Sequence, residues 1–261
     1  QTAAMNTPKN SAPPQNARPV VLITGAARRI GSEIAQLFHQ NDFDVALHYN
    51  SSTNEAGALA QKLNTIRANS AQIFQAQLTD TTSVKQMGLE VLSWKNQLNV
   101  LINNASSFYP TPLDGANEEQ WDNLIGSNLK GPYFLCQTVA LALQKSRGSI
   151  VTIADIYARS PLKGYSIYCI AKAGNAMLTK SLAKELAPNV RVNGIAPGVI
   201  LWPNTDEQMS EETKQQIIDK VPLRRSGSPE DIAQTAFFLA TSARYMTGQI
   251  IAVDGGSSLN A

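Results

Sequence analysis

The sequence predicts an α/β fold in which a parallel, doubly wound sheet forms a single domain. Short continuous apolar runs, of which residues 20–23 are the first, are typical of strands buried on both faces. Amphipathic helical patterns alternate with these runs, as expected of βα units. No internal repeat or linker divides the chain. Polar turns follow several of the runs, at the place where the carboxyl ends of parallel strands form a ligand crevice.

The first βα unit contains a glycine turn. After the apolar run, the sequence continues as Thr24-Gly25-Ala26-Ala27-Arg28-Arg29-Ile30-Gly31 and then as a helical pattern through Gln40. Strand, glycine turn and helix in this order present helix N-terminal amides to an anion, so this turn is a candidate site for dinucleotide phosphates. Arg29 replaces the middle glycine of the usual three-glycine fingerprint and adds a guanidinium. A tight turn without a ligand is the alternative.

The second strand, expected at 43–48, ends in Tyr49-Asn50-Ser51-Ser52. A dinucleotide fold that selects NAD normally carries an acidic residue here to bind the ribose hydroxyls. These positions hold no acid, and Asn50, Ser51 and Ser52 can donate hydrogen bonds to a 2′-phosphate without repelling it. The turn therefore favours NADP over NAD, with the alternative that these residues only form the turn.

The later elements continue the alternation. We expect strands at 71–76, 100–102, 149–154, 189–195 and 249–253, and helices at about 53–68, 82–96, 121–136, 166–187, 211–219 and 229–241. Ser228 followed by Pro229 is typical of a helix start. The long, proline-punctuated segment 200–225 is typical of a lid over the crevice.

Further candidate ligand groups follow the strand at 100–102. Asn103-Asn104-Ala105-Ser106 closes this strand, and Ser107-Phe108-Tyr109-Pro110 leaves it. Phe108 is a candidate stacking platform at the crevice, with a plain hydrophobic anchor as the alternative. Asn128 lies inside the next helical pattern, where an asparagine near a sheet edge can hold a water or bend the backbone.

Tyr168 and Lys172 stand four residues apart at the start of a long helical pattern, so the phenol and the ammonium lie on one helix face. An ordinary tyrosine has a pKa of about 10, and a fixed neighbouring cation favours phenolate. Such a tyrosine can donate a proton during a reduction and be recharged through the lysine. A tyrosine packed on the helix beside a solvated lysine is the alternative.

Composition excludes several other classes. With 261 residues, of which 43% are apolar, the chain can bury a sizeable core, and a net charge of +2 from scattered basic residues describes no nucleic-acid or membrane-surface binder. No apolar run reaches the ~18 residues of a membrane span. The two cysteines fit buried thiols in a reduced, cytoplasmic setting, and the two histidines form no metal-site spacing.

The N-terminal residues 1–18 are polar and proline-containing and lack the apolar segment of a signal peptide, so we expect a disordered tail. Residues 1–4 precede Met5, which suggests an addition ahead of the natural start. The folded domain is expected over 19–261.

Together, these motifs resemble the short-chain dehydrogenase/reductase family over residues 19–258. They are Thr24-Gly25 with Gly31, Asn103-Asn104-Ala105, Asn128, Tyr168 with Lys172, Pro197-Gly198 and Asp254-Gly255-Gly256. The resemblance implies a Rossmann-type, seven-stranded sheet, an NAD(P) cofactor, and a homotetramer whose interface uses the long helices. It places the cofactor against Gly25, Arg28, Arg29, Ile30, Gly31, Tyr49, Asn50, Ser51, Leu78, Asn104, Ala105, Ser106, Asn128, Lys172, Pro197 and Gly198.

One departure bears on the substrate. Ordinary members have a serine thirteen residues before the tyrosine, where it donates a hydrogen bond to a carbonyl, and this chain has Asp155 at that position. An ionised carboxylate cannot donate a hydrogen bond, and it repels the oxyanion that forms when a ketone accepts hydride. Asp155 instead suits a C=N bond, whose nitrogen must gain a proton that Asp155 and Tyr168 can relay.

This pattern, together with Arg29 and the segment from Ser106 to Pro110, resembles the pteridine reductases. That resemblance implies a pterin ring stacked between Phe108 and the nicotinamide, and catalysis by Asp155, Tyr168 and Lys172. The implied substrate contacts are Arg29, Ser106, Phe108, Asp155, Tyr168 and, on the lid, Trp202, for which packing is the alternative. The expected reaction is NADPH-dependent reduction of a pterin or folate.

Two rival functions remain. The first is a carbonyl reductase of the same fold, such as a 3-oxoacyl carrier-protein reductase or a sugar reductase, against which Asp155 argues. The second is a non-catalytic dinucleotide-binding sensor or scaffold, against which Tyr168 and Lys172 argue.

Overall fold

One parallel sheet organises the chain. The computed structural model describes residues 17–200 and 210–259. Within these residues, seven strands pair in the order β3-β2-β1-β4-β5-β6-β7, and every pair is parallel. The strands are β1 Val20–Ile23, β2 Asp44–Tyr49, β3 Ala71–Gln75, β4 Val100–Asn103, β5 Ser149–Ile153, β6 Arg191–Pro197 and β7 Ile250–Val253. The predicted doubly wound, seven-stranded sheet is confirmed.

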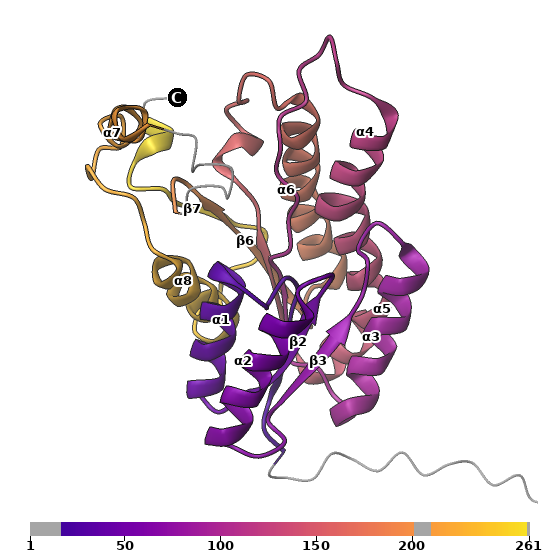
Figure 1. The fold of residues 1–261 in the computed structure, drawn as a ribbon. Helices are drawn as coiled ribbons and strands as arrows, with labels where there is room; N and C mark the ends of the chain where they lie inside the picture. Colours follow the sequence, from indigo (N-terminus) through magenta and orange to yellow (C-terminus); the bar gives the residue numbers. More distant parts are fainter. Residues whose placement is uncertain (1–16, 201–209, 260–261) are drawn as a thin grey trace, which may run out of the picture.

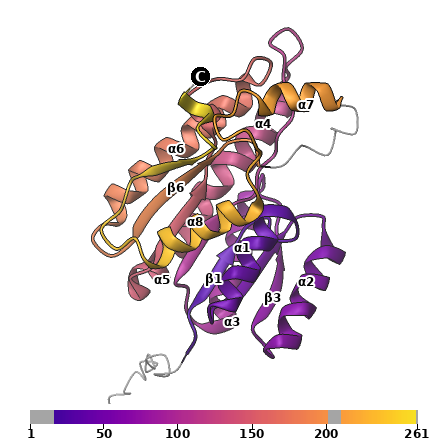
Figure 2. The ribbon, with the colours of Figure 1, turned by 90° about the vertical axis from the view of Figure 1, so that its left-hand side faces the viewer.

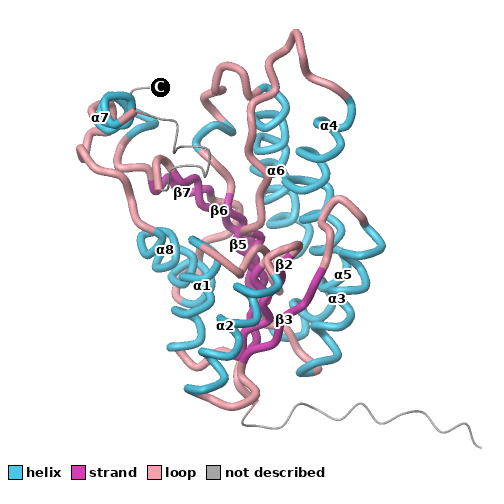
Figure 3. The backbone as a smooth tube through the Cα atoms, in the orientation of Figure 1, coloured by secondary structure: helices cyan, strands magenta, loops and turns pink. Residues whose placement is uncertain are grey.

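Two helical layers cover the sheet (Figures 1 and 3). On one face lie α1 Arg29–Gln40, α2 Thr53–Ile66 and α8 Pro229–Thr241, and on the other lie α3 Thr81–Lys95, α5 Gly131–Ser146 and α6 Ser166–Leu186. In β1, Val21 and Ile23 join the first layer's core, while Val20 and Leu22 join the second. Because side chains alternate across a strand, a strand covered on both faces requires an unbroken apolar run.

The first layer includes a close helix pair. Figure 2 shows α8 lying beside α1, and Phe38 of α1 packs edge-on against Phe237 of α8 with ring centroids 5.1 Å apart. The start of α8 has a capping box in which the Ser228 hydroxyl and the Asp231 carboxylate each accept a backbone N–H. The predicted helix start is confirmed.

Several elements differ from the predictions. The helix expected at 121–136 consists of α4 Glu118–Ile125, a π turn Gly126–Lys130 and α5. β6 begins at Arg191 instead of residue 189, because the Asn189 and Val190 amides bond back to the Leu186 carbonyl. Two short 3₁₀ helices, Ile156–Ala158 and Ser257–Leu259, were not predicted.

The predicted tail and lid are described only in part. Residues 1–16 lie outside the described ranges, while the Arg18 carbonyl accepts a 2.6 Å hydrogen bond from Gln97. In the lid segment, α7 Glu211–Ile218 is present, but Trp202 lies outside the described residues. No helix in the described part of the chain is long and apolar enough to cross a membrane.

A pair of helical glycines gives a stability prediction. A Cβ added at Gly31 would lie 2.1 Å from the Gly25 carbonyl oxygen, whereas one added at Gly57 meets nothing within 4 Å. We expect Gly31→Ala to destabilise the protein by about 1–3 kcal/mol through overpacking. Gly57→Ala should stabilise it by about 0.5–1 kcal/mol through helix propensity. Urea unfolding measures both, and equal midpoints for the two variants would contradict the prediction.

Candidate active site

The predicted site residues come together at one edge of the sheet. Since all strands are parallel, the turns that follow β1, β2, β4, β5 and β6 emerge at their common carboxyl end. These turns bring the glycine turn, Asn50, Ser106, Asp155 and Gly198 to that edge, and the start of α6 adds Tyr168 and Lys172.

The glycine turn is fixed against the end of β4. The Thr24 hydroxyl oxygen accepts hydrogen bonds from the amides of Asn104 (2.9 Å) and Ala105 (3.0 Å). The Asn104 side chain in turn donates to the carbonyls of Thr24 and Gly25. Gly25 has φ +64, and a Cβ there would lie 3.0 Å from the Ala105 Cα, so both the conformation and the contact require glycine.

Arg29 occupies the left-handed region with φ +53. Its backbone therefore has a conformation that favours glycine, while its side chain adds an exposed guanidinium. The leading N–H groups of α1 have no intrahelical partners, as at any helix start. A glycine-lined cradle, helix amides and two arginines are the donor set that dinucleotide phosphates require, so these residues fit such a cofactor.

Arg28 reaches the turn after β2. Its Nη2 donates to the Ser52 hydroxyl, and its Nε lies 3.5 Å from a Glu55 carboxylate oxygen. The guanidinium beside the Ser52 hydroxyl can bind a phosphate, although Glu55 partly neutralises its charge. Tyr49, Asn50 and Ser51 add no acid to this turn. Ser52, which the sequence already indicated as a donor to a 2′-phosphate, belongs to this group.

Ser106 is positioned by Asn128. The Ser106 hydroxyl donates a 2.6 Å hydrogen bond to the Asn128 side-chain oxygen, and the Asn128 amide donates to the Ser107 and Leu124 carbonyls. Asn128 lies in the π turn, where the Gly131 amide bonds to the Gly126 carbonyl. The π turn directs Asn128 toward the loop after β4, where its side chain contacts Ser106 and Ser107.

Asp155 and Tyr168 form the centre of the site. The Tyr168 hydroxyl donates a 2.5 Å hydrogen bond to Asp155 Oδ2, while Asp155 Oδ1 accepts from the Tyr157 amide. Burial raises the pKa of Asp155, although Lys172 and these hydrogen bonds act in the opposite direction. The carboxyl group therefore stays protonated to a higher pH than an ordinary aspartic acid.

The pKa of Tyr168 shifts in the direction opposite to the expected one. Burial raises it well above its usual value, and the Asp155 carboxylate raises it further. The Lys172 ammonium lies 5.7 Å from the phenol ring centroid, whereas the carboxylate oxygen is in direct contact with the hydroxyl. Without a ligand, Tyr168 thus keeps its proton, which is the state a proton donor needs.

Lys172 is fully buried and not solvated. Its ammonium donates a 3.0 Å hydrogen bond to the Ile153 carbonyl at the end of β5. Burial lowers the pKa of Lys172 to about 8, although the charge on Asp155 opposes this change. A lysine near this pKa can exchange a proton with its surroundings at neutral pH.

One face of the Phe108 ring is covered by another side chain of the protein. One face of its ring stacks on Tyr165 at a centroid distance of 4.7 Å and an interplanar angle of 15°, and it meets Tyr168 edge-on at 4.8 Å. The ring is still 37% exposed. Only the face opposite Tyr165 can serve as the predicted platform, and this stacking partner was not predicted.

The remaining predicted cofactor residues line the same edge. Leu78 is buried at the turn after β3, and the Gly198 amide bonds to the Val253 carbonyl at 3.0 Å, which fixes the Pro197-Gly198 turn beside β7. Ile30 is half-buried in the first turn of α1. Sequence reasoning missed His48, whose ring contacts the glycine turn, because nothing in its local pattern separates it from a core residue.

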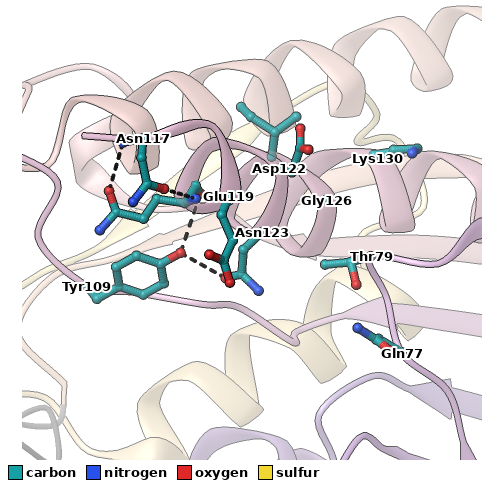
Figure 4. A pocket seen from close by; sticks show the side chains of 11 residues that line it. Gln77, Thr79, Tyr109, Asn117, Glu119, Asp122, Asn123, Gly126 and Lys130 are labelled. Carbon is teal, nitrogen blue, oxygen red and sulfur yellow. Dashed lines mark hydrogen bonds between the residues drawn. The ribbon is translucent and has the colours of Figure 1, made fainter. Parts of the chain in front are cut away.

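A hollow of about 670 Å³ opens between the β3–α3 turn and α4 (Figure 4). Gln77, Thr79, Tyr109, Asn123 and Lys130 are among its lining residues, and the Tyr109 hydroxyl donates to Asn123. Asp155, Tyr168 and Lys172 do not line it. No group of three or more potential metal ligands occurs among the described His, Cys, Asp and Glu residues.

Comparison with known proteins agrees with this geometry. Residues 25–258 match the family model described as enoyl-(acyl carrier protein) reductase. Pteridine reductase 1 of Leishmania tarentolae is 38% identical, over 92% of this chain and 96% of its own length. The 3-oxoacyl-[acyl-carrier-protein] reductase of Staphylococcus aureus strain Mu50 is also 38% identical, over 90% and 96%, and that of Chlamydia pneumoniae is 35% identical, over 90% and 95%.

These relatives share the whole domain but differ in the substrates that their names record. Because the match extends over the sheet, the glycine turn and the Tyr168 and Lys172 positions, it fixes the class of chemistry, which is reduction with a nicotinamide cofactor. The chain belongs to the short-chain dehydrogenase/reductase family and is one of its oxidoreductases.

Proposed function

We propose that this protein is a pteridine reductase that uses NADPH to reduce a C=N bond of a pterin or folate. The observation behind this proposal is the 2.5 Å hydrogen bond from the Tyr168 hydroxyl to Asp155. A carboxylate beside the proton donor opposes the oxyanion of a reduced ketone. It suits a C=N bond, because an imine nitrogen is basic enough to take the proton as the hydride arrives, so that no anion has to form beside the carboxylate.

The cofactor is proposed to be NADPH. The amides at the start of α1 and the Arg29 guanidinium would hold the pyrophosphate, while Arg28, Asn50, Ser51 and Ser52 would hold the 2′-phosphate. When bound, NADPH supplies the hydride. The short-chain relatives support a nicotinamide cofactor, and the Arg28 guanidinium beside the Ser52 hydroxyl supports the phosphorylated form.

In the proposed mechanism, two side chains move the proton and a third stabilises the charge that this leaves. Tyr168 keeps its proton because burial and Asp155 raise its pKa, and it donates that proton to the substrate nitrogen. Asp155, whose own pKa is raised by burial, returns a proton to Tyr168. The Lys172 ammonium stabilises the transient phenolate and holds the end of β5 in place.

The substrate site is proposed to lie against the free face of Phe108, with Ser106 and Arg29 supplying polar contacts. A flat, hydrogen-bonding pterin ring suits an aromatic platform next to a hydroxyl and a guanidinium. Dihydrobiopterin, dihydromonapterin and dihydrofolate all share this ring. A carbonyl substrate is the second candidate, favoured by the carrier-protein reductases among the relatives.

We also propose that the protein is a homotetramer in the cytoplasm, without a nucleic-acid or membrane partner. Leu141 on α5 and Met177 on α6 are 73% and 60% exposed, and Tyr133 and Ile170 on the same helices are about half exposed. Apolar side chains gathered on neighbouring helices suit a subunit interface. Cys136 and Cys169 are free and buried, which suits a reducing compartment.

The Asp155→Ser variant tests the substrate class. Serine keeps the helix cap at the Tyr157 amide but removes the carboxyl group, so we expect kcat for dihydrobiopterin to fall about 10²-fold or more. NADPH oxidation, followed by absorbance, gives the rate. Asp114→Ser, at an exposed loop position, is the matched control and should keep full activity. Turnover of an acetoacetyl thioester by the wild type, with none of any pterin, would instead identify a carbonyl reductase.

The Arg28→Ala variant tests the cofactor. Removing the guanidinium should lower the preference for NADPH over NADH about tenfold or more, because a hydrogen bond to a charged group contributes about 1.5–3 kcal/mol. Steady-state kinetics with both cofactors measures this preference. Arg18→Ala is the control, since Arg18 precedes β1 and lies 3.8 Å from Asp42, away from the crevice. An unchanged preference would refute the proposed role of Arg28.

The Met177→Glu variant tests the assembly. A charge at an apolar interface should split the tetramer, because its burial without a partner is strongly unfavourable. Light scattering after size exclusion gives the mass. Ile66→Glu, at an exposed position on α2, should leave the mass unchanged. A wild-type protein that is monomeric at micromolar concentration would exclude the tetramer.

A further inference from the structure

His48 connects two parts of the cofactor crevice. It lies near the end of β2 and is 1% exposed. Its Nδ1 accepts a 3.0 Å hydrogen bond from the Gly25 amide, and its Nε2 lies 3.1 Å from the Ala76 carbonyl oxygen. The His48 carbonyl also accepts from the Ala26 amide at 2.9 Å. One residue thus holds the first two amides of the glycine turn and the end of β3.

The contacts fix the state of the imidazole ring. A backbone amide can only donate, so Nδ1 must be without a proton where it faces Gly25. The proton then sits on Nε2 and is donated to the Ala76 carbonyl. Burial lowers the pKa of His48 to about 4, which keeps this neutral form at physiological pH. A charged ring would have no acceptor for the Gly25 amide.

The two peptide groups that flank Gly25 are both held. The Gly25 amide points to His48, and the Gly25 carbonyl accepts from Asn104 and lies against Gly31. The orientation of these two peptide groups therefore sets where α1 begins and where its leading amides point. On the other side of the ring, Ala76 directly precedes Gln77 and Leu78 at the turn after β3.

We propose that His48 is a positioning residue for the dinucleotide, which fixes the glycine turn relative to the turn after β3. The two turns would hold different parts of one ligand, the pyrophosphate at the start of α1 and another part of the dinucleotide near Leu78. Their separation must match the length of that ligand. This inference rests on the proposed function only in requiring a nicotinamide dinucleotide in the crevice, and it does not depend on the pterin.

Two amide substitutions separate the two hydrogen bonds. In His48→Asn the side-chain oxygen can take the place of Nδ1 and accept from Gly25, while in His48→Gln the side-chain amide can take the place of Nε2 and donate to Ala76. Each variant loses one hydrogen bond, so both should unfold at similarly lowered temperatures. A role in positioning the glycine turn predicts different cofactor affinities for the two variants.

The experiment measures NADPH binding by calorimetry, together with steady-state kinetics. We expect His48→Gln to raise the NADPH Kd about tenfold or more, and His48→Asn to stay within about threefold of the wild type, because only Gln leaves the Gly25 amide without an acceptor. At saturating NADPH, kcat should remain within about twofold in both variants, since no reacting group has been changed.

His39→Gln is the control. His39 is the other histidine of the chain, and its Nε2 pairs with Ser70 at 2.7 Å. It is buried but far from the turn, so its replacement should change unfolding without changing NADPH affinity. Equal Kd values for the two His48 variants would overturn the positioning role. Wild-type protein that binds neither NADPH nor NADH would overturn the proposed function and this inference with it.

Discussion

The hydrogen bond between Tyr168 and Asp155 joins the two elements on which the site depends. Asp155 lies two residues after β5, and Tyr168 stands in the first turn of α6, so this contact fixes the helix against the sheet at the crevice. Lys172 repeats the connection one turn later through the Ile153 carbonyl. The position of the proton donor is therefore set by the sheet, and α6 must pack against β5 and β6 for the chemistry to be possible.

The region around Tyr168 and Asp155 differs from a stable core, which is apolar. A buried lysine and a buried phenol lie beside a half-buried carboxyl group, and burial shifts the pKa of each toward its neutral form. Desolvating such groups is unfavourable, which marks the region as a functional site and not as packing. The apolar clusters on both faces of the sheet supply the stability that this arrangement lacks.

The features that could be predicted from the sequence are those that depend on residues close together in the chain. The order of strands and helices, the glycine turn and the Tyr168 and Lys172 pair follow from apolar periodicity and short spacings. The Phe108–Tyr165 stack, the His48 contacts and the upward shift of the Tyr168 pKa could not be predicted, because each depends on distances between segments far apart in the chain. The substrate is not decided by the fold, since relatives with different substrates share it equally.

The π turn at Gly126–Lys130 makes the helical segment intolerant of a length change. A π turn accommodates one residue more than an α-helical turn, so a single deletion there would convert it to an ordinary helix. All of α5 would then rotate by about 100° relative to α4, given 3.6 residues per turn. Leu135, Val139 and Leu143 would leave the sheet. The one extra residue in the π turn thus allows two things at once. It lets α5 pack on the sheet, and it lets Asn128 point to the active site.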